Sequence, residues 1–100
     1  MSENIIQHAI VATARKAGWN VTTFSTDRRE RQQRRSIPDL YMTHDGQQRQ
    51  VWIEVKDAGK KARPDQQAWI DKVVASGGEA YCCDSLDSAW LVLQNGVDDE

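Results

Sequence analysis

Long apolar runs are missing from this sequence of 100 residues. The longest, Ala89 to Leu93, is far shorter than the stretch of about 20 apolar residues that spans a bilayer. The first ten residues contain an acid and no cationic flank, unlike a secretory signal. The sequence therefore predicts a cytoplasmic protein that does not enter a membrane.

Cysteine is also scarce, and its placement argues against two kinds of stabilising site. Cys82 and Cys83 are adjacent, and neither a second cysteine pair nor a histidine at ligand spacing accompanies them, as a disulfide framework or a zinc site would require. We expect both as reduced residues of a buried strand, because free cysteine is usually buried. A content of 39% hydrophobic and 28% charged residues fits one globular domain. We place this domain at residues 1–96, followed by a short acidic tail at residues 97–100.

The net charge of −2 conceals an asymmetry along the chain. Residues 1–63 carry 12 Lys and Arg against 7 Asp and Glu, whereas residues 64–100 carry 1 against 8. Residues 28–35 read RRERQQRR, with five arginines, one acid and no apolar residue, which predicts a loop. Such a run is equally typical of a solvated segment. Its place just before Pro38-Asp39, however, would hold a polyanion beside that carboxylate.

Turn signals and hydrophobic periodicity predict seven elements. Ser2 and Gly18 delimit a first helix, and Pro64 and Gly77 delimit a second. The turn signal His44-Asp45-Gly46 predicts that the segments on either side pair as an antiparallel hairpin. The expected strands cover residues 21–24, 37–43, 50–56 and 79–83, and a last helix begins after Ser85 and ends at Asn95. The element order is therefore α-β-β-β-α-β-α.

The hairpin would gather three ionisable groups at its open end. Alternate residues of a strand share a face, so Trp52, Glu54 and Lys56 point the same way. Antiparallel pairing brings Asp39 close to Glu54 and Lys56. A solvent-exposed cross-strand ion pair is the simpler interpretation. It gives no reason, however, for Pro38 at the strand start or for basic loops on both sides.

These residues resemble a known signature. Pro38-Asp39, a gap of fourteen residues and then Glu54-Val55-Lys56 is similar to the motif of PD-(D/E)XK nucleases. The closer resemblance is to the VRR-NUC family and covers most of the chain. Its further matches are Glu3 and Gln7 on an early helix, the arginine-rich lead into Asp39, the glycine-lysine loop at Gly59-Lys60, and the helix motif Pro64, Gln66, Trp69 and Ile70. Two positions depart from the family pattern: Ser36 replaces a common glycine, which would cost about 1–2 kcal/mol if its φ must be positive, and Arg63 replaces a frequent capping serine.

The resemblance implies an α/β fold with a restriction-endonuclease-like α-β-β-β-α-β core, a mixed central sheet and flanking helices. It also implies a Mg²⁺-dependent endodeoxyribonuclease in which Mn²⁺ can substitute. Asp39, Glu54 and the backbone carbonyl of Val55 would hold the metal. Lys56 would position the attacking water or stabilise the developing charge, and Gln66 would orient the water or the phosphate. Glu3 would join as a ligand or through a water, unless it is a solvent-exposed carboxylate favoured by the helix dipole.

Family members of this length resemble Holliday-junction resolvases, which implies a homodimer that cleaves branched DNA, either four-way junctions or flaps. The expected phosphate contacts are Arg28, Arg29, Arg31, Arg34, Arg35, Lys60 and Lys61. Two alternatives stay open: a DNA-binding module of the nuclease fold without cleavage, and an acidic adaptor whose C-terminal part binds protein. We expect His8 and His44 at the surface, Trp69 and Trp90 in the core, and Trp52 either lining the cleft or covering the hairpin.

Overall fold

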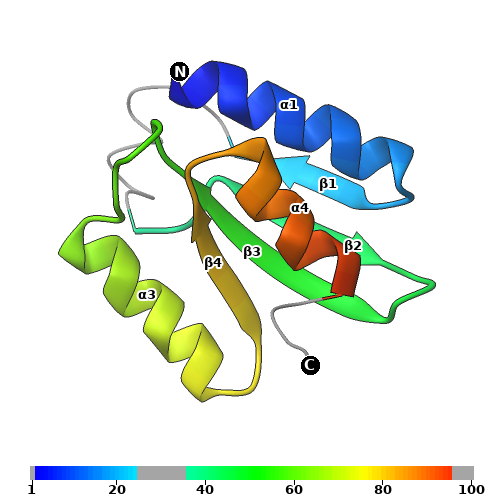
Figure 1. Cartoon of the computed structure of the whole chain (residues 1–100). Helices are drawn as coiled ribbons and strands as arrows, with labels where there is room; N and C mark the ends of the chain where they lie inside the picture. Colours follow the sequence, from blue (N-terminus) through cyan, green and yellow to red (C-terminus); the bar gives the residue numbers. More distant parts are fainter. Residues whose placement is uncertain (1, 25–35, 96–100) are drawn as a thin grey trace.

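The computed structural model describes residues 2–24 and 36–95 (Figure 1). Its elements are α1 (Glu3–Lys16), β1 (Asn20–Thr23), β2 (Leu40–His44), β3 (Arg49–Val55), α3 (Pro64–Ala75), β4 (Glu79–Cys83) and α4 (Leu86–Asn95). The expected order of helices and strands is confirmed. The arginine-rich loop and the acidic tail lie outside the described residues.

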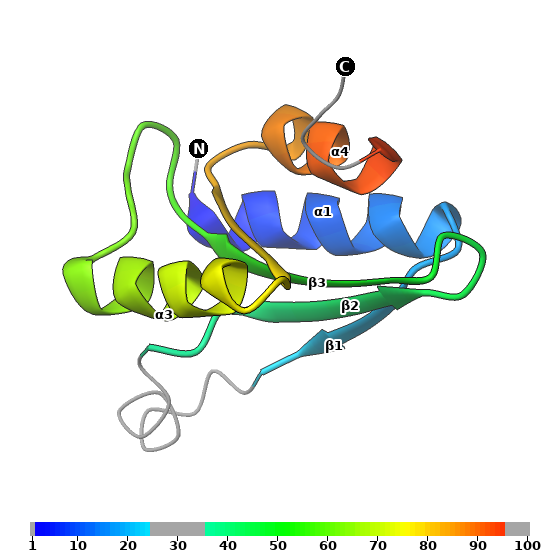
Figure 2. The same cartoon turned by 90° about the horizontal axis from the view of Figure 1, so that it is seen from below.

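A mixed four-stranded sheet organises the chain. The strand order is β1-β2-β3-β4, in which β1, β2 and β3 pair antiparallel and β4 joins β3 in parallel. Figure 2 shows α1 and α4 together on one side of the sheet. On the opposite face, α3 packs against the sheet through contacts between Trp69 and Trp52 and between Gln66 and Glu54. The mixed sheet and flanking helices agree with the fold class expected from the sequence.

The main core lies between the sheet and the pair α1 and α4. Ile6, Ile10 and Ala14 are buried at a spacing of four residues along α1, as expected for one helix face. The strands contribute alternate residues, of which Val51 and Ile53 are fully buried. Trp90 packs against this core, half-buried. Trp69, in contrast, is half-buried on the other face against Trp52, so its expected place in the core is wrong.

The C-terminal end of α1 meets the hairpin turn. Gly18 has φ of 93°, a conformation that glycine adopts without steric cost. A Cβ atom there would lie 3.1 Å from His44 Nε2. The His44 ring is half-buried, with Nε2 3.1 Å from the carbonyl oxygen of Ala17 and the ring edge-on to Trp19 at 5.1 Å. His44 thus holds the hairpin to the helix end and is not an ordinary surface residue.

β1 and β3 each begin one residue earlier than expected, and the segment that leads into Asp39 differs in two respects. The second strand begins at Leu40 and not at residue 37, because Pro38 has no backbone N–H to donate to a ladder. Ser36 does not adopt positive φ: within residues 2–24 and 36–95, the non-glycine residue that does so is Gln48, at 53° in the hairpin turn. The expected backbone cost at Ser36 therefore does not arise.

Arg49 links the sheet to the end of α4. Its Nε and Nη2 donate to the two carboxylate oxygens of Glu79 at 2.9 and 2.6 Å. The guanidinium also donates to the backbone carbonyls of Val92 and Leu93 at 2.9 and 3.2 Å, and it lies 5.3 Å from the centre of the Trp19 ring. Carbonyls in the last turn of a helix lack hydrogen-bond donors within the helix. Arg49 provides donors for two of them. Sequence patterns gave no sign of this role.

The cysteines lie where the sequence predicts them. Both belong to β4 and are free thiols, with Cys83 buried and Cys82 half-buried. Burial raises the pKa of Cys83 to about 11, so this thiol stays protonated at neutral pH. Across the described part of the chain, every helix is too short or too polar to cross a membrane.

Candidate active site

Asp39 and Glu54 lie side by side at one end of the sheet. Leu40 pairs with Ile53, so the residue before one faces the residue after the other. Asp39 directly precedes β2, and its Oδ2 accepts a hydrogen bond from the backbone N–H of Val55 at 2.8 Å. The hairpin register and this bond together place the two carboxylates next to each other, as the sequence predicts.

Glu54 is a buried carboxylate with two polar neighbours. Its exposed fraction is 3%. Gln66 Nε2 donates to Glu54 Oε2 at 3.0 Å, and Lys56 Nζ lies 3.6 Å from the same oxygen. Burial raises the pKa of Glu54 to about 8, the charge of Asp39 raises it as well, and the charge of Lys56 opposes both. Negative charge at this end of the sheet is therefore only partly compensated by the protein.

The orientation of Gln66 is fixed by the start of α3. Its Oε1 accepts from the backbone N–H of Arg63 at 2.9 Å, so its NH₂ group must face Glu54. The side chain of Arg63 donates to Asp65, and Asp65 Oδ2 also accepts from Ser36 Oγ at 3.1 Å. The two positions that depart from the family pattern thus meet at Asp65. They tie the segment before Asp39 to the helix that carries Gln66, a connection that sequence reasoning missed.

Glu3 approaches this cluster from the first turn of α1. Its backbone N–H donates to Asp57 Oδ1, which anchors the helix start beside the end of β3. The side chain is half-buried, and its charge is among the causes that raise the pKa of Glu54. These observations favour a position near the carboxylates over a solvated carboxylate.

The expected DNA contacts divide into two groups. Lys60 and Lys61 are exposed on the loop between β3 and α3, which is held to the body of the protein by a hydrogen bond from the Gly59 N–H to Asp84 Oδ2 at 2.9 Å. The arginines at positions 28, 29, 31, 34 and 35 lie outside the described residues. His8 is exposed on α1, as expected.

The donor set fits a hard divalent cation. Within residues 2–24 and 36–95, no three His, Cys, Asp or Glu side chains are arranged to hold a metal. Mg²⁺ keeps several waters, however, and binds through one or two protein carboxylates. Asp39 and Glu54 supply two such groups, and the Val55 carbonyl is adjacent in sequence. The buried, partly compensated charge of Glu54 suits a site that gains a cation.

Comparisons with known proteins agree on one family. The model of the VRR-NUC domain matches residues 2–87. A solved structure described as a VRR_NUC domain is 19% identical, with 92% of this chain and 94% of that chain covered and a TM-score of 0.73. A second, described as a VRR_NUC domain protein, is 18% identical, with 94% and 86% covered and a TM-score of 0.70. The comparison with curated proteins gives no match.

These matches carry different weight. Structural similarity at such low identity shows the fold, whereas the family model covers most of the chain, including Asp39, Glu54, Lys56 and Gln66. The chain belongs to the VRR-NUC family, whose members are nucleases of the PD-(D/E)XK type.

Proposed function

We propose that this protein is a metal-dependent DNA endonuclease that hydrolyses phosphodiester bonds in branched DNA. The observation that carries the proposal is the arrangement of Asp39, Glu54, Lys56 and Gln66 at one end of the sheet, with Glu54 buried and contacted by both Lys56 and Gln66. A buried carboxylate beside a second carboxylate lowers the stability of the fold, and a bound cation would offset that cost.

Each group has a task that its contacts suit. Asp39, Glu54 and the Val55 carbonyl would hold Mg²⁺ or Mn²⁺. Bound there, the metal supplies Lewis-acid activation and lowers the pKa of a coordinated water. Lys56, close to the Glu54 carboxylate, would position the attacking water or stabilise negative charge on the phosphoryl group. Gln66 holds Glu54 in place and would orient the water or the phosphate. Glu3 would act as a further ligand or through a water.

The proposal is tested by incubating the protein with labelled four-way junction, flap, linear duplex and single-stranded DNA. We expect cutting with Mg²⁺ or Mn²⁺, none with EDTA, and faster cutting of junction or flap than of duplex. Binding without cutting in either metal would instead favour a DNA-binding module of nuclease fold. Equal rates on junction and duplex would reject the preference for branched DNA but not the endonuclease activity.

A homodimer suits a branched substrate, because two identical sites related by a two-fold axis can cut two strands symmetrically. Light scattering should therefore give about twice the monomer mass of 11.4 kDa. A mass equal to that of the monomer at the concentrations used for cleavage would contradict the dimer.

The arginine-rich loop gives a separate prediction about binding. Replacing Arg28, Arg29 and Arg31 with serine should weaken binding to all DNA sequences alike. It should also reduce the slope of log K against log salt by about 0.9 for each lost duplex contact. Filter binding over a salt series, with EDTA present, measures both quantities. An unchanged slope would mean that these side chains make no phosphate contact.

A further inference from the structure

Four aromatic rings form a cluster beside the carboxylates. Trp52 is at its centre: Phe24 stacks on it with ring centres 6.0 Å apart and planes 10° apart, Tyr41 lies at 4.6 Å, and Trp69 meets it edge-on at 4.9 Å. All four are half-buried. Trp19, in contrast, is 3% exposed within the main core. The cluster is thus a partly open aromatic surface on the face opposite α1 and α4.

The backbone fixes this cluster to the candidate active site. The N–H of Phe24 donates to the carbonyl of Asp39 at 3.2 Å. Trp52 precedes Glu54 by two residues on the same strand face, roughly 7 Å away along the strand. That distance equals about two base steps of a DNA strand at 3.4 Å each. A strand with its phosphate at Asp39 and Glu54 therefore brings a base about two positions along within reach of the aromatic cluster.

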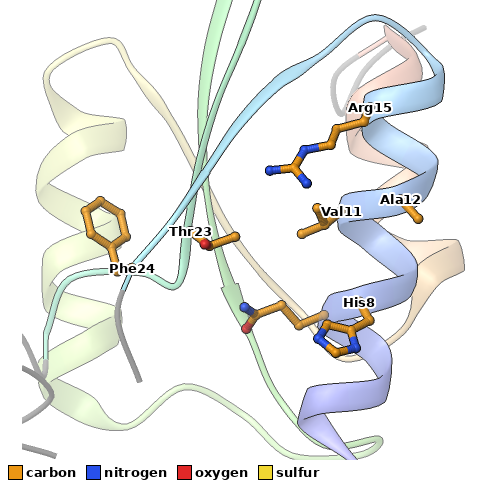
Figure 3. A pocket seen from close by; sticks show the side chains of 7 residues that line it. His8, Val11, Ala12, Arg15, Thr23 and Phe24 are labelled. Atoms are coloured by element: carbon orange, nitrogen blue, oxygen red, sulfur yellow. The ribbon is translucent and has the colours of Figure 1, made fainter. Parts of the chain in front are cut away.

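Phe24 also borders open space. Figure 3 shows the hollow between α1 and the end of β1, with Arg15, Val11 and His8 on the helix side, Thr23 on the strand, and Phe24 at the far border. The lining combines apolar and polar groups and includes a guanidinium, which donates to the carbonyl of Val21 at 3.2 Å. Open space therefore reaches the end of β1, where Phe24 belongs to the aromatic cluster.

We propose that Phe24, supported by Trp52 stacked against it, forms a stacking platform for an unpaired base close to the phosphate that is cut. The inference rests on the proposed function and names the feature of branched DNA that the site recognises, an unpaired base. Bases inside a duplex are covered on both sides by their neighbours, whereas bases at a junction, flap or frayed end offer a face to an aromatic side chain. Stacking tolerates any base, so it selects DNA structure without selecting sequence.

Abasic substitution tests the platform directly. On a junction or flap that the protein cuts, each nucleotide flanking the mapped cut is replaced in turn by a tetrahydrofuran abasic site. We expect one position at which the substitution slows wild-type cleavage by about tenfold, the loss expected for one stacked base. If no position slows wild-type cleavage, the inference is overturned.

The variant Phe24→Leu assigns that effect to the platform. It should cut the intact substrate about tenfold more slowly and show no further loss at the sensitive position. Phe24→Trp should restore both the rate and the sensitivity. Leu91→Ala, at a residue of α4 that is 68% exposed, is the matched control and should behave as wild type. Thermal unfolding establishes that each variant is folded. Full sensitivity in Phe24→Leu overturns the inference.

A binding assay separates this inference from the proposed function. With EDTA present, fluorescence anisotropy compares a short labelled single strand with the same strand lacking its bases. Wild type should bind the intact strand about tenfold more tightly than Phe24→Leu does, and both proteins should bind the abasic strand equally. Equal affinity of the two proteins for the intact strand overturns the platform even if DNA is cut. If wild type binds the intact strand about tenfold more tightly than Phe24→Leu but does not cut DNA, the nuclease function is rejected and the stacking platform is supported.

Discussion

Asp39→Asn is expected to lower the rate of Mg²⁺-dependent cleavage by about 10³-fold or more. Asparagine keeps an oxygen that can accept the hydrogen bond from the Val55 N–H, which Asp39 Oδ2 accepts at 2.8 Å. The substitution therefore removes the charge and spares the fold. Several kcal/mol of metal-assisted stabilisation depend on that charge, and each 1.36 kcal/mol corresponds to a tenfold change in rate.

Single-turnover cleavage and anisotropy with EDTA measure rate and DNA affinity separately. Affinity should stay close to that of wild type, because the basic side chains are unchanged. Glu54→Gln should show a similar loss of rate. Asp45→Asn, in the exposed turn at the other end of the hairpin, is the matched control and should retain full activity. Retention of wild-type cutting by Asp39→Asn would reject Asp39 as a metal ligand and with it the proposed chemistry.

Arg49→Met should lower the free energy of unfolding by about 3 kcal/mol, the second large effect that we expect. The arginine and glutamate side chains are 14% and 28% exposed, and removing one partner of a mostly buried pair leaves the other charge uncompensated. The variant also loses the bonds to the carbonyls of Val92 and Leu93. For a domain of this size the unfolding temperature should fall by roughly 12 to 24 °C.

Urea unfolding followed by circular dichroism measures this loss. Lys72→Met, at an exposed position in the last turn of α3, removes a cation of the same charge and should change stability by less than about 0.5 kcal/mol. A loss of similar size in both variants would mean that overall charge, and not the contacts of Arg49, determines the effect.

The same pair gives the sign of a pH effect. The hydrogen bond that Glu79 accepts from Arg49 lowers the pKa of Glu79 below the ordinary value of 4.5. A carboxylate whose pKa is lower in the folded state stabilises the fold fully when the pH is above its pKa in the unfolded state. This contribution disappears as the pH falls through its pKa in the folded state. The difference in stability between wild type and Arg49→Met should therefore be constant near neutral pH and shrink below about pH 4.5. A difference that does not change with acidification would contradict this assignment.

Local patterns were sufficient to predict the hairpin and the helix that follows it. His44-Asp45-Gly46 and the alternation around Glu54 fix the register, and the register places Asp39 opposite Glu54. Gln66 follows from its position in the first turn of a helix that starts at Pro64. These features depend on neighbours within about thirty residues of sequence, where turn chemistry and periodicity determine the contacts.

Contacts between distant segments could not be predicted in this way. Arg49 reaches the end of α4 because β4 adds in parallel to β3, a choice that no pattern in either strand reveals. Phe24 lies beside Asp39 because β1 pairs with β2 in one particular register. β1 has only four residues, three of them polar, and such a short strand specifies its register weakly. The role of His44 could not be predicted either, because it depends on the end of α1 lying against the hairpin turn.

The burial of Glu54 has a consequence for selection on this protein. A carboxylate that is 3% exposed beside a second carboxylate lowers the stability of the fold, and a neutral side chain of similar shape would not carry that cost. Mutagenesis followed by selection for heat resistance alone should therefore enrich substitutions at position 54 that are inactive as nucleases. A selection that requires DNA cleavage should retain glutamate at position 54. The residues found at this position therefore distinguish variants selected for stability from variants selected for nuclease activity.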